Sequence, residues 1–142
     1  MSFAPYLHFQ GNCADAMRFY ADVFGAGDLM IMRYSEAPPD AGMPAGDAGD
    51  GVMHASLTAG GQYLMASDFP PGMPGEAQAA VSVTHSTDDL VRARQVFDRL
   101  MEGGTEIMAF GPTFWSHGFG MLKDRFGTAW MVPAMVATLL MI

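Results

Sequence analysis

Four histidines, one cysteine and one aspartate at the end of an apolar segment are the side chains with the most obvious chemical potential. The histidines are His8, His54, His85 and His117. No two of them are four residues apart, the spacing that places two imidazoles on one helix face to bind a metal. Local spacing does not assemble a serine, histidine and aspartate triad either. The role of each histidine therefore depends on the element that carries it.

Residues 114–131, FWSHGFGMLKDRFGTAWM, predict a β-hairpin with its turn at residues 124–127. At the strand period of two, one face of the first strand carries four large side chains: Trp115, His117, Phe119 and Met121. We expect them to form the wall of a ligand pocket, with His117 as its polar group. A sandwich core would use the same apolar residues, and a solvent-exposed strand end would suit His117 equally.

The other candidates are open to two interpretations each. His8 and His85 fall at strand positions opposite to the expected cavity face, which favours packing beneath a helix. His54 also falls at an outward-facing strand position, and the alternative interpretation is that it lines the ligand site. Asp68 follows LMAS and either accepts a hydrogen bond from a ligand or starts a turn. Cys13 lies in the first turn of an expected helix without an evident base, which favours a buried, inert thiol.

The composition of the chain excludes several classes of partner and of protein. The chain has 142 residues, a formal net charge of −8 and a sequence pI near 4.6. Such a surface repels phosphate backbones and anionic lipids, so we expect no nucleic-acid or membrane partner. The single cysteine excludes an internal disulfide and fits a reducing compartment. Because residues 1–10 also lack the pattern of a signal peptide, we expect a cytoplasmic protein.

The expected elements follow the order β-α-β-β-β twice. A shift of 77 residues places Asn12 on Asp89, two expected helix N-caps, and superposes the expected helices 12–24 and 88–101. A shift of 66 superposes the last hairpin of each half and places Met65 on Met131. Self-similarity at half the chain length indicates a duplicated module.

These patterns predict an α+β fold. We expect two βαβββ modules whose mixed sheet curves around a cleft, with both helices on the outside. The single domain 1–142 would then consist of pseudo-repeats at about 3–69 and 77–135. The segment 38–51, PPDAGMPAGDAGDG, has no counterpart in the second half and is a candidate lid.

The segments PYLHFQGNCADAMRFY, VMHASL, LMASD, GPTFW and FGMLKDRFGTAWMV resemble the PhnB-like branch of the vicinal oxygen chelate superfamily. That superfamily includes glyoxalase I, extradiol dioxygenases and antibiotic-resistance proteins. Members of the branch are often labelled 3-demethylubiquinone 3-methyltransferase-like. Methyl transfer fits poorly here, because no Gly-rich turn after a first strand marks a nucleotide-cofactor site, and we expect no cofactor.

The resemblance also implies where a metal would bind. Metal-dependent members place four ligands at one inward position on the first and last strand of each module. In this chain the corresponding residues are Pro5, Met65, Ser82 and Met131. None is a good ligand for Zn²⁺, Ni²⁺, Fe²⁺ or Mg²⁺. We therefore expect a ligand site without a metal, lined by the following residues: Leu7, Phe9, Met65, Ser82, Trp115, His117, Phe119, Met121 and Met131.

Three functions remain open. The first is binding of an apolar or aromatic small molecule without chemistry, as antibiotic-sequestering members of the superfamily do. The second is an enzyme, with or without a metal, of the lyase, isomerase or dioxygenase type. The third is a dimerising scaffold without a ligand. A homodimer is expected in each case, because the superfamily commonly dimerises and the segment from Met131 to Ile142 is too apolar to lie free in water.

Overall fold

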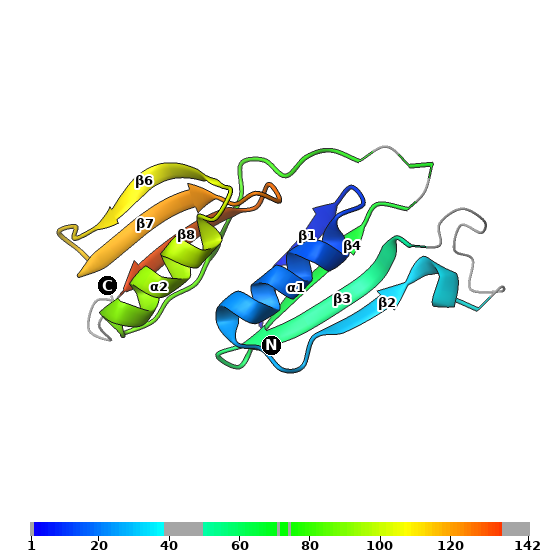
Figure 1. The fold of residues 1–142 in the computed structure, drawn as a ribbon, viewed down its shortest axis with the longest axis horizontal. Coiled ribbons are helices and arrows are strands. Elements are labelled where there is room, and N and C mark those ends of the chain that lie inside the picture. The colour runs from blue at the N-terminus through cyan, green and yellow to red at the C-terminus, as the bar shows by residue number, and fades with distance from the viewer. Residues whose placement is uncertain (1, 39–49, 71, 74, 135–142) are drawn as a thin grey trace. The chain divides into compact units, whose positions relative to one another are not determined.

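The computed structural model describes residues 2–38, 50–70, 72–73 and 75–134. The chain divides into two compact units, unit 1 (residues 1–78) and unit 2 (residues 79–142), which repeat one order of elements (Figure 1). Most of the candidate lid at 38–51, and most of the apolar segment after Met131, lie outside the described residues. The lid remains a prediction for that reason.

Unit 1 contains one four-stranded mixed sheet and one long helix. Its elements are β1 (Tyr6–Phe9), α1 (Cys13–Phe24), β2 (Met30–Arg33), a short 3-10 helix (Tyr34–Glu36), β3 (Val52–Ala59) and β4 (Gln62–Asp68). The strand order is β1-β4-β3-β2. β1 runs parallel to β4, and the other pairs are antiparallel.

Unit 2 repeats this topology. Its elements are β5 (Ser82–Thr84), α2 (Leu90–Leu100), β6 (Thr105–Gly111), β7 (Gly118–Lys123) and β8 (Ala129–Ala134), with the strand order β5-β8-β7-β6. β5 is parallel to β8, and the other pairs are antiparallel. The predicted α+β fold of two βαβββ modules is confirmed. Neither helix among the described residues has the length and apolar character needed to cross a bilayer.

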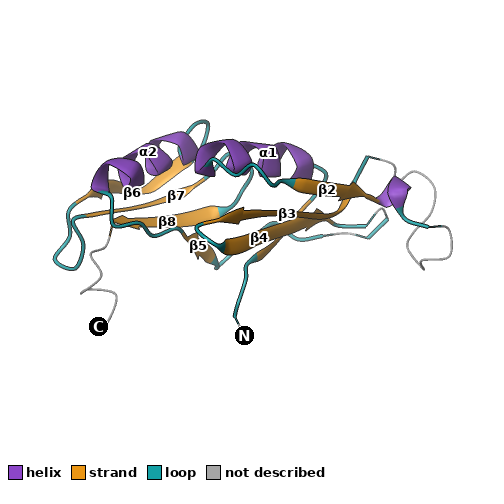
Figure 2. Cartoon of the chain, turned by 90° about the horizontal axis from the view of Figure 1, so that it is seen from below, coloured by secondary structure: helices purple, strands orange, loops and turns teal. Residues whose placement is uncertain are grey.

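In each unit the helix covers one face of its own sheet (Figure 2). The apolar residues of α1 recur at helical spacing, so that Ala16, Phe19, Tyr20 and Val23 are all buried. In α2 the buried positions are Ala93, Val96, Phe97 and Leu100. Each sheet therefore has one helix-covered face and one face that its own helix leaves uncovered.

The two helices begin in different ways. Asp89 caps α2 as predicted, because its Oδ1 accepts hydrogen bonds from the backbone N–H groups of Val91 (3.0 Å) and Arg92 (3.1 Å). Asn12 takes the N-cap position of α1, but its side chain makes no capping hydrogen bond. Instead, Asp68 at the end of β4 accepts hydrogen bonds from backbone N–H groups at the start of α1. Its Oδ1 lies 2.8 Å from the Gly11 nitrogen and 3.1 Å from the Cys13 nitrogen.

The connection between first strand and helix differs by one residue between the units. Tyr6 pairs with Met65, and Thr84 pairs with Met131. The N-cap follows six residues after Tyr6 but five after Thr84. Equivalent residues of the two first strands are therefore 78 positions apart, whereas equivalent residues of the two helices are 77 positions apart. The extra residue fits at Gly11, whose φ of 108° is a conformation that glycine adopts readily.

The first strand of the last hairpin is shorter than predicted. β7 starts at Gly118 and leaves Trp115 and His117 in the preceding loop. The loop closes on itself, since the Thr113 nitrogen donates to the Ser116 carbonyl (3.0 Å). β5 spans only Ser82–Thr84, and it does not extend toward the N-terminus because Ala80 has a φ of 60°, which extended backbone cannot accommodate.

Candidate functional site

The uncovered face of the unit 1 sheet is rich in methionine and aromatic side chains. The register places Met30, Ser56, Met65 and Tyr6 in one row across the four strands. Met32 pairs with His54, and His8 pairs with Ser67, on the same face. We call these eight residues the open face of unit 1. Its large side chains are partly exposed, for example 40 % for Met30 and 38 % for Tyr6.

Four aromatic rings form a continuous row along this side of the sheet. Tyr6 lies between His54 and His8, with ring centroids 5.7 Å and 5.2 Å away. His8 stacks on Phe69 at 5.5 Å. Tyr6 Oη lies 3.0 Å from His54 Nδ1, within hydrogen-bond distance. The row therefore joins two imidazoles and a phenol through stacking and one hydrogen bond.

The opposite face of the unit 1 sheet belongs to the core. Phe9 pairs with Asp68, whose carboxylate bonds the start of α1, and Leu7 pairs with Ala66. Leu7 and Phe9 are 7 % and 2 % exposed. They are therefore on the helix-covered face, away from Met65. The expectation that they share a surface with Met65 is wrong, because the extra residue at Gly11 reverses the strand parity that was counted back from the helix cap.

The open face of unit 2 carries the other predicted side chains. One row across its strands consists of Met108, Met121, Met131 and Thr84. Phe119 lies two residues from Met121 on the same face, and the Trp115 ring meets it edge-on at 5.5 Å. The alternate residues of β7 face α2, since a Cβ added at Gly120 would lie 2.5 Å from Cε2 of Phe97 on that helix.

The structure thus groups most of the predicted ligand residues, but within separate units. Ser82, Phe119, Met121 and Met131 share the open face of unit 2, with Trp115 against Phe119, while Met65 lies on the open face of unit 1. His117 is exposed in the loop before β7. Ligand contact by these residues remains a prediction.

The open faces also contain residues that were not predicted to lie there. His8 was expected beneath a helix, yet it is exposed, meets the Tyr6 ring in a tilted contact and stacks on Phe69. Tyr6, Met30, Met32 and Met108 were not singled out. The alternation Met30-Ile31-Met32 was an available signal, because a period of two places both methionines on one face.

His85 differs from the other three histidines. It follows β5 at a position of the opposite parity to Thr84 and is half-buried. Burial, and secondarily the Arg92 charge on α2, lower the pKa of His85 below its usual value. This environment agrees with the predicted packing beneath a helix.

Asp68 has neither of the roles predicted for it. It is 3 % exposed, and its carboxylate accepts hydrogen bonds from three backbone N–H groups, with Val52 N completing the set at 2.8 Å from Oδ2. Its own carbonyl accepts from the Tyr34 hydroxyl at 2.8 Å. Asp68 therefore ties β4 to β3 and to the start of α1, and its role is structural.

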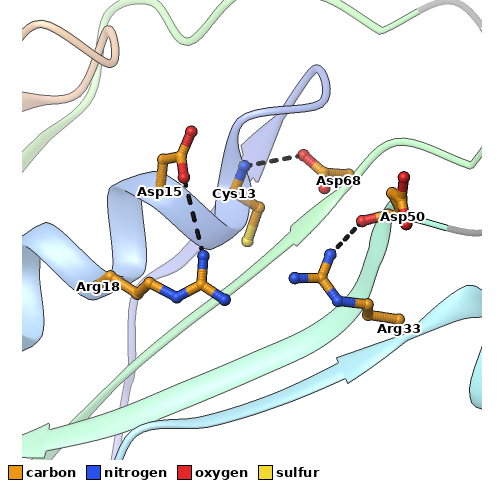
Figure 3. A network of polar contacts seen from close by, with 6 residues as sticks. All are labelled: Cys13, Asp15, Arg18, Arg33, Asp50 and Asp68. Atoms are coloured by element: carbon orange, nitrogen blue, oxygen red, sulfur yellow. Dashed lines mark hydrogen bonds and ion pairs between the residues drawn. The ribbon is translucent and has the colours of Figure 1, made fainter.

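Cys13 lies beside Asp68 in this polar network (Figure 3). It is completely buried, and burial together with the Asp68 carboxylate raises its pKa to about 12, against a weaker opposing effect of Arg33. A thiol of this pKa is protonated at neutral pH and is a poor nucleophile. The prediction of an unreactive structural cysteine agrees with this environment.

The donor set of the two sheets does not suit a divalent cation. With the corrected register, the paired first- and last-strand positions are Tyr6 with Met65 and Thr84 with Met131. Two thioethers, a phenol and an aliphatic hydroxyl are weak ligands compared with imidazole, thiolate or carboxylate. Within the described segments, no three His, Cys, Asp or Glu side chains form a group that could hold a metal ion.

Comparisons with known proteins agree with this fold. The family model described as 3-demethylubiquinone-9 3-methyltransferase matches residues 1–133. Protein YjdN of Escherichia coli (strain K12) is 33 % identical over 140 residues, which cover 93 % of this chain and 94 % of YjdN.

Solved structures extend the comparison. The crystal structure of protein PA1353 from Pseudomonas aeruginosa is 40 % identical, covers 94 % of this chain and 96 % of its own, and superposes with a TM-score of 0.85. The fosfomycin resistance protein FosX from Listeria monocytogenes, solved with Mn(II), shares the fold with a TM-score of 0.66 at 8 % identity. That match covers 100 % of this chain and 98 % of the FosX chain.

The likeness to FosX shows the fold alone, whereas the family model and the YjdN relative span nearly the whole chain. The chain belongs to the PhnB-like 3-demethylubiquinone-9 3-methyltransferase family and has the fold of the vicinal oxygen chelate proteins.

Proposed function

We propose that this protein binds an apolar or aromatic small molecule on its open sheet faces and uses no divalent metal to do so. The observation that carries the proposal is the pair of methionine-rich rows, Met30 to Tyr6 in unit 1 and Met108 to Thr84 in unit 2. Thioether side chains are polarisable and flexible, so they adapt to aromatic surfaces of varied shape.

The alternative functions predict other behaviour. An enzyme of the lyase, isomerase or dioxygenase type would turn over a substrate, and the weak donor set of the sheets argues against its metal-dependent forms. A scaffold without a ligand would show no stabilisation by small molecules. The homodimer and the cytoplasmic location remain predictions; light scattering at micromolar concentration tests the first of them.

Binding is tested by thermal unfolding with naphthalene as an apolar aromatic probe. A ligand that binds only the folded state raises the free energy of unfolding by mass action, by about 1.4 kcal/mol at ten times its Kd, and thereby raises the melting temperature. Met65→Glu and Met131→Glu place a carboxylate on each open face and should weaken binding at their own face by about tenfold or more, because an aromatic ligand would desolvate the charge. Gln95→Glu, an exposed change on α2 with the same charge, is the matched control and should leave binding unchanged. Absence of saturable stabilisation by naphthalene and also by 1-naphthol would contradict the proposal.

The metal-free part of the proposal predicts the metal content of the purified protein. After dialysis without chelator, elemental analysis should find well under one equivalent of Zn²⁺, Ni²⁺, Mn²⁺ or Fe per chain. Replacing the hydration shell of such an ion with thioethers and a phenol is unfavourable by several kcal/mol. One equivalent that survives dialysis, and that is lost on Met65→Ala or Met131→Ala, would show that these faces do bind a metal.

A further inference from the structure

The hydrogen-bonded pair of Tyr6 and His54 gives the open face of unit 1 a specific polar group. Tyr6 Oη on β1 and His54 Nδ1 on β3 are 3.0 Å apart across β4, on a face that also carries Met30, Met32 and Met65. Among the residues that the structure describes, His54 Nε2 has no hydrogen-bond partner, and the side chain is only partly buried. One nitrogen of the ring is thus occupied by Tyr6, and the other is available to a ligand.

The ring row holds this pair in place. Tyr6 is stacked on His54 and meets His8 in a tilted contact, and His8 is stacked on Phe69. The backbone of Gly75 lies close against the Phe69 ring, because a Cβ added there would overlap Phe69 Cδ2. Gln10 holds that backbone through its Nε2, which donates to the Gly75 carbonyl at 2.8 Å. The row is therefore supported at its Phe69 end, and His54 forms its other end.

A neutral imidazole bonded to a phenol always leaves one donor for a third group. If the Tyr6 hydroxyl donates to Nδ1, the ring proton is on Nε2, which can donate to a ligand. If Nδ1 donates to Oη, the Tyr6 hydroxyl is the donor and Nε2 is an acceptor. In either tautomer the pair can bond a hydroxyl or a carbonyl group.

The charge of the open face restricts the ligand further. None of its eight residues is Asp, Glu, Lys or Arg. A carboxylate or phosphate ligand would find no cation there to offset its desolvation. Met32 pairs with His54 and Met65 pairs with Tyr6, so a methionine lies beside each member of the polar pair.

We propose that Tyr6 and His54 form the polar end of a site on the open face of unit 1 for an uncharged aromatic molecule that carries a hydroxyl or carbonyl group. The inference rests on the proposed binding function and specifies its ligand class. The methionine side chains contact the ring system, and the Tyr6–His54 pair bonds the polar substituent.

Three probes with one ring system test the inference by calorimetry: naphthalene, 1-naphthol and 1-naphthoate. The Kd of 1-naphthol should be three- to tenfold lower than that of naphthalene, as one hydrogen bond allows, and 1-naphthoate should bind more weakly than 1-naphthol. The double substitution Tyr6→Phe with His54→Phe keeps both rings and removes both polar groups, so the two neutral probes should then bind within twofold of each other. Tyr63→Phe, at a 59 % exposed tyrosine of β4, is the matched control and should keep the preference.

A second readout covers the case in which the double variant does not fold. In the unmodified protein, 1-naphthol should shift the ¹⁵N resonances of the His54 ring, and naphthalene should shift them much less. Equal binding of naphthalene and 1-naphthol, with no response of His54, overturns this inference and leaves the proposed binding function standing.

Other outcomes separate the two proposals. Failure of both neutral probes to bind overturns this inference together with the proposed function. If Met65→Glu converts a dimer to a monomer and 1-naphthol does not bind, the face is an interface between two copies of the chain, and the inference is overturned.

Discussion

Asp68→Ala is expected to lower the free energy of unfolding by about 3–5 kcal/mol, the largest effect of a single substitution that the structure indicates in unit 1. The change leaves the N–H groups of Gly11, Cys13 and Val52 without their acceptor. Each buried donor that loses its partner costs about 1–3 kcal/mol, and the three losses are not fully additive. Asp68→Asn keeps one acceptor oxygen and should cost about 2 kcal/mol. Urea unfolding followed by circular dichroism measures both.

Asp15→Asn is the matched control for Asp68. Asp15 is an exposed residue of α1 whose side chain is 77 % exposed and reaches Arg18 at 3.8 Å. Exposed ion pairs of this kind contribute between 0 and about 1 kcal/mol, so the control should change stability by less than about 0.5 kcal/mol. A cost for Asp68→Ala as small as that of the control would show that the carboxylate does not tie β4 to α1.

Asp124→Ala is the corresponding prediction for unit 2, with an expected loss of about 2–4 kcal/mol. Asp124 is 4 % exposed in the turn between β7 and β8. Its Oδ1 accepts from the nitrogens of Phe126 (2.9 Å) and Thr128 (3.0 Å), and its Oδ2 accepts from Trp130 Nε1 (2.8 Å). The substitution leaves the indole N–H of a 2 % exposed tryptophan without this acceptor.

A double-mutant cycle isolates the bond between Asp124 and Trp130. Trp130→Phe removes the indole donor and keeps an aromatic ring, and it is combined with Asp124→Ala. A coupling energy of about 1–2 kcal/mol is expected for a buried hydrogen bond to a carboxylate. Asp98→Asn, which affects an exposed pair with Arg94 on α2, should cost less than about 0.5 kcal/mol. Coupling near zero would contradict the role given to Asp124.

Local signals in the sequence were sufficient to predict the repeated fold. The helical spacing of Phe19, Tyr20 and Val23, and the cap at Asp89, depend on residues only a few positions apart. The hairpin β7–β8 was likewise marked by its turn residues, and both modules follow the predicted order of elements. Such short-range patterns follow directly from the geometry of a helix turn or a tight reversal.

The parity of β1 and the role of Asp68 depended on information that local patterns do not contain. One additional residue beside Gly11 moves Leu7 and Phe9 from the expected cavity face to the core. Asp68 bonds residues more than fifty positions earlier in the chain, at Gly11 and Cys13. The pairing of Tyr6 with His54 is also long-range, which is why neither was recognised as a partner of the other.

The central claim is that an aromatic small molecule binds on the open sheet faces, and methionine-methyl NMR tests it most directly. With ¹³C-methyl methionine, titration of 1-naphthol should shift the signals of Met30, Met32 and Met65, on the face that holds the Tyr6–His54 pair. Met17, fully buried under the other face of the same sheet, is the internal control and should not move. Saturable shifts at the three open-face methionines are the predicted result. No shifts, or shifts of Met17 without those of Met30, Met32 and Met65, would contradict the account.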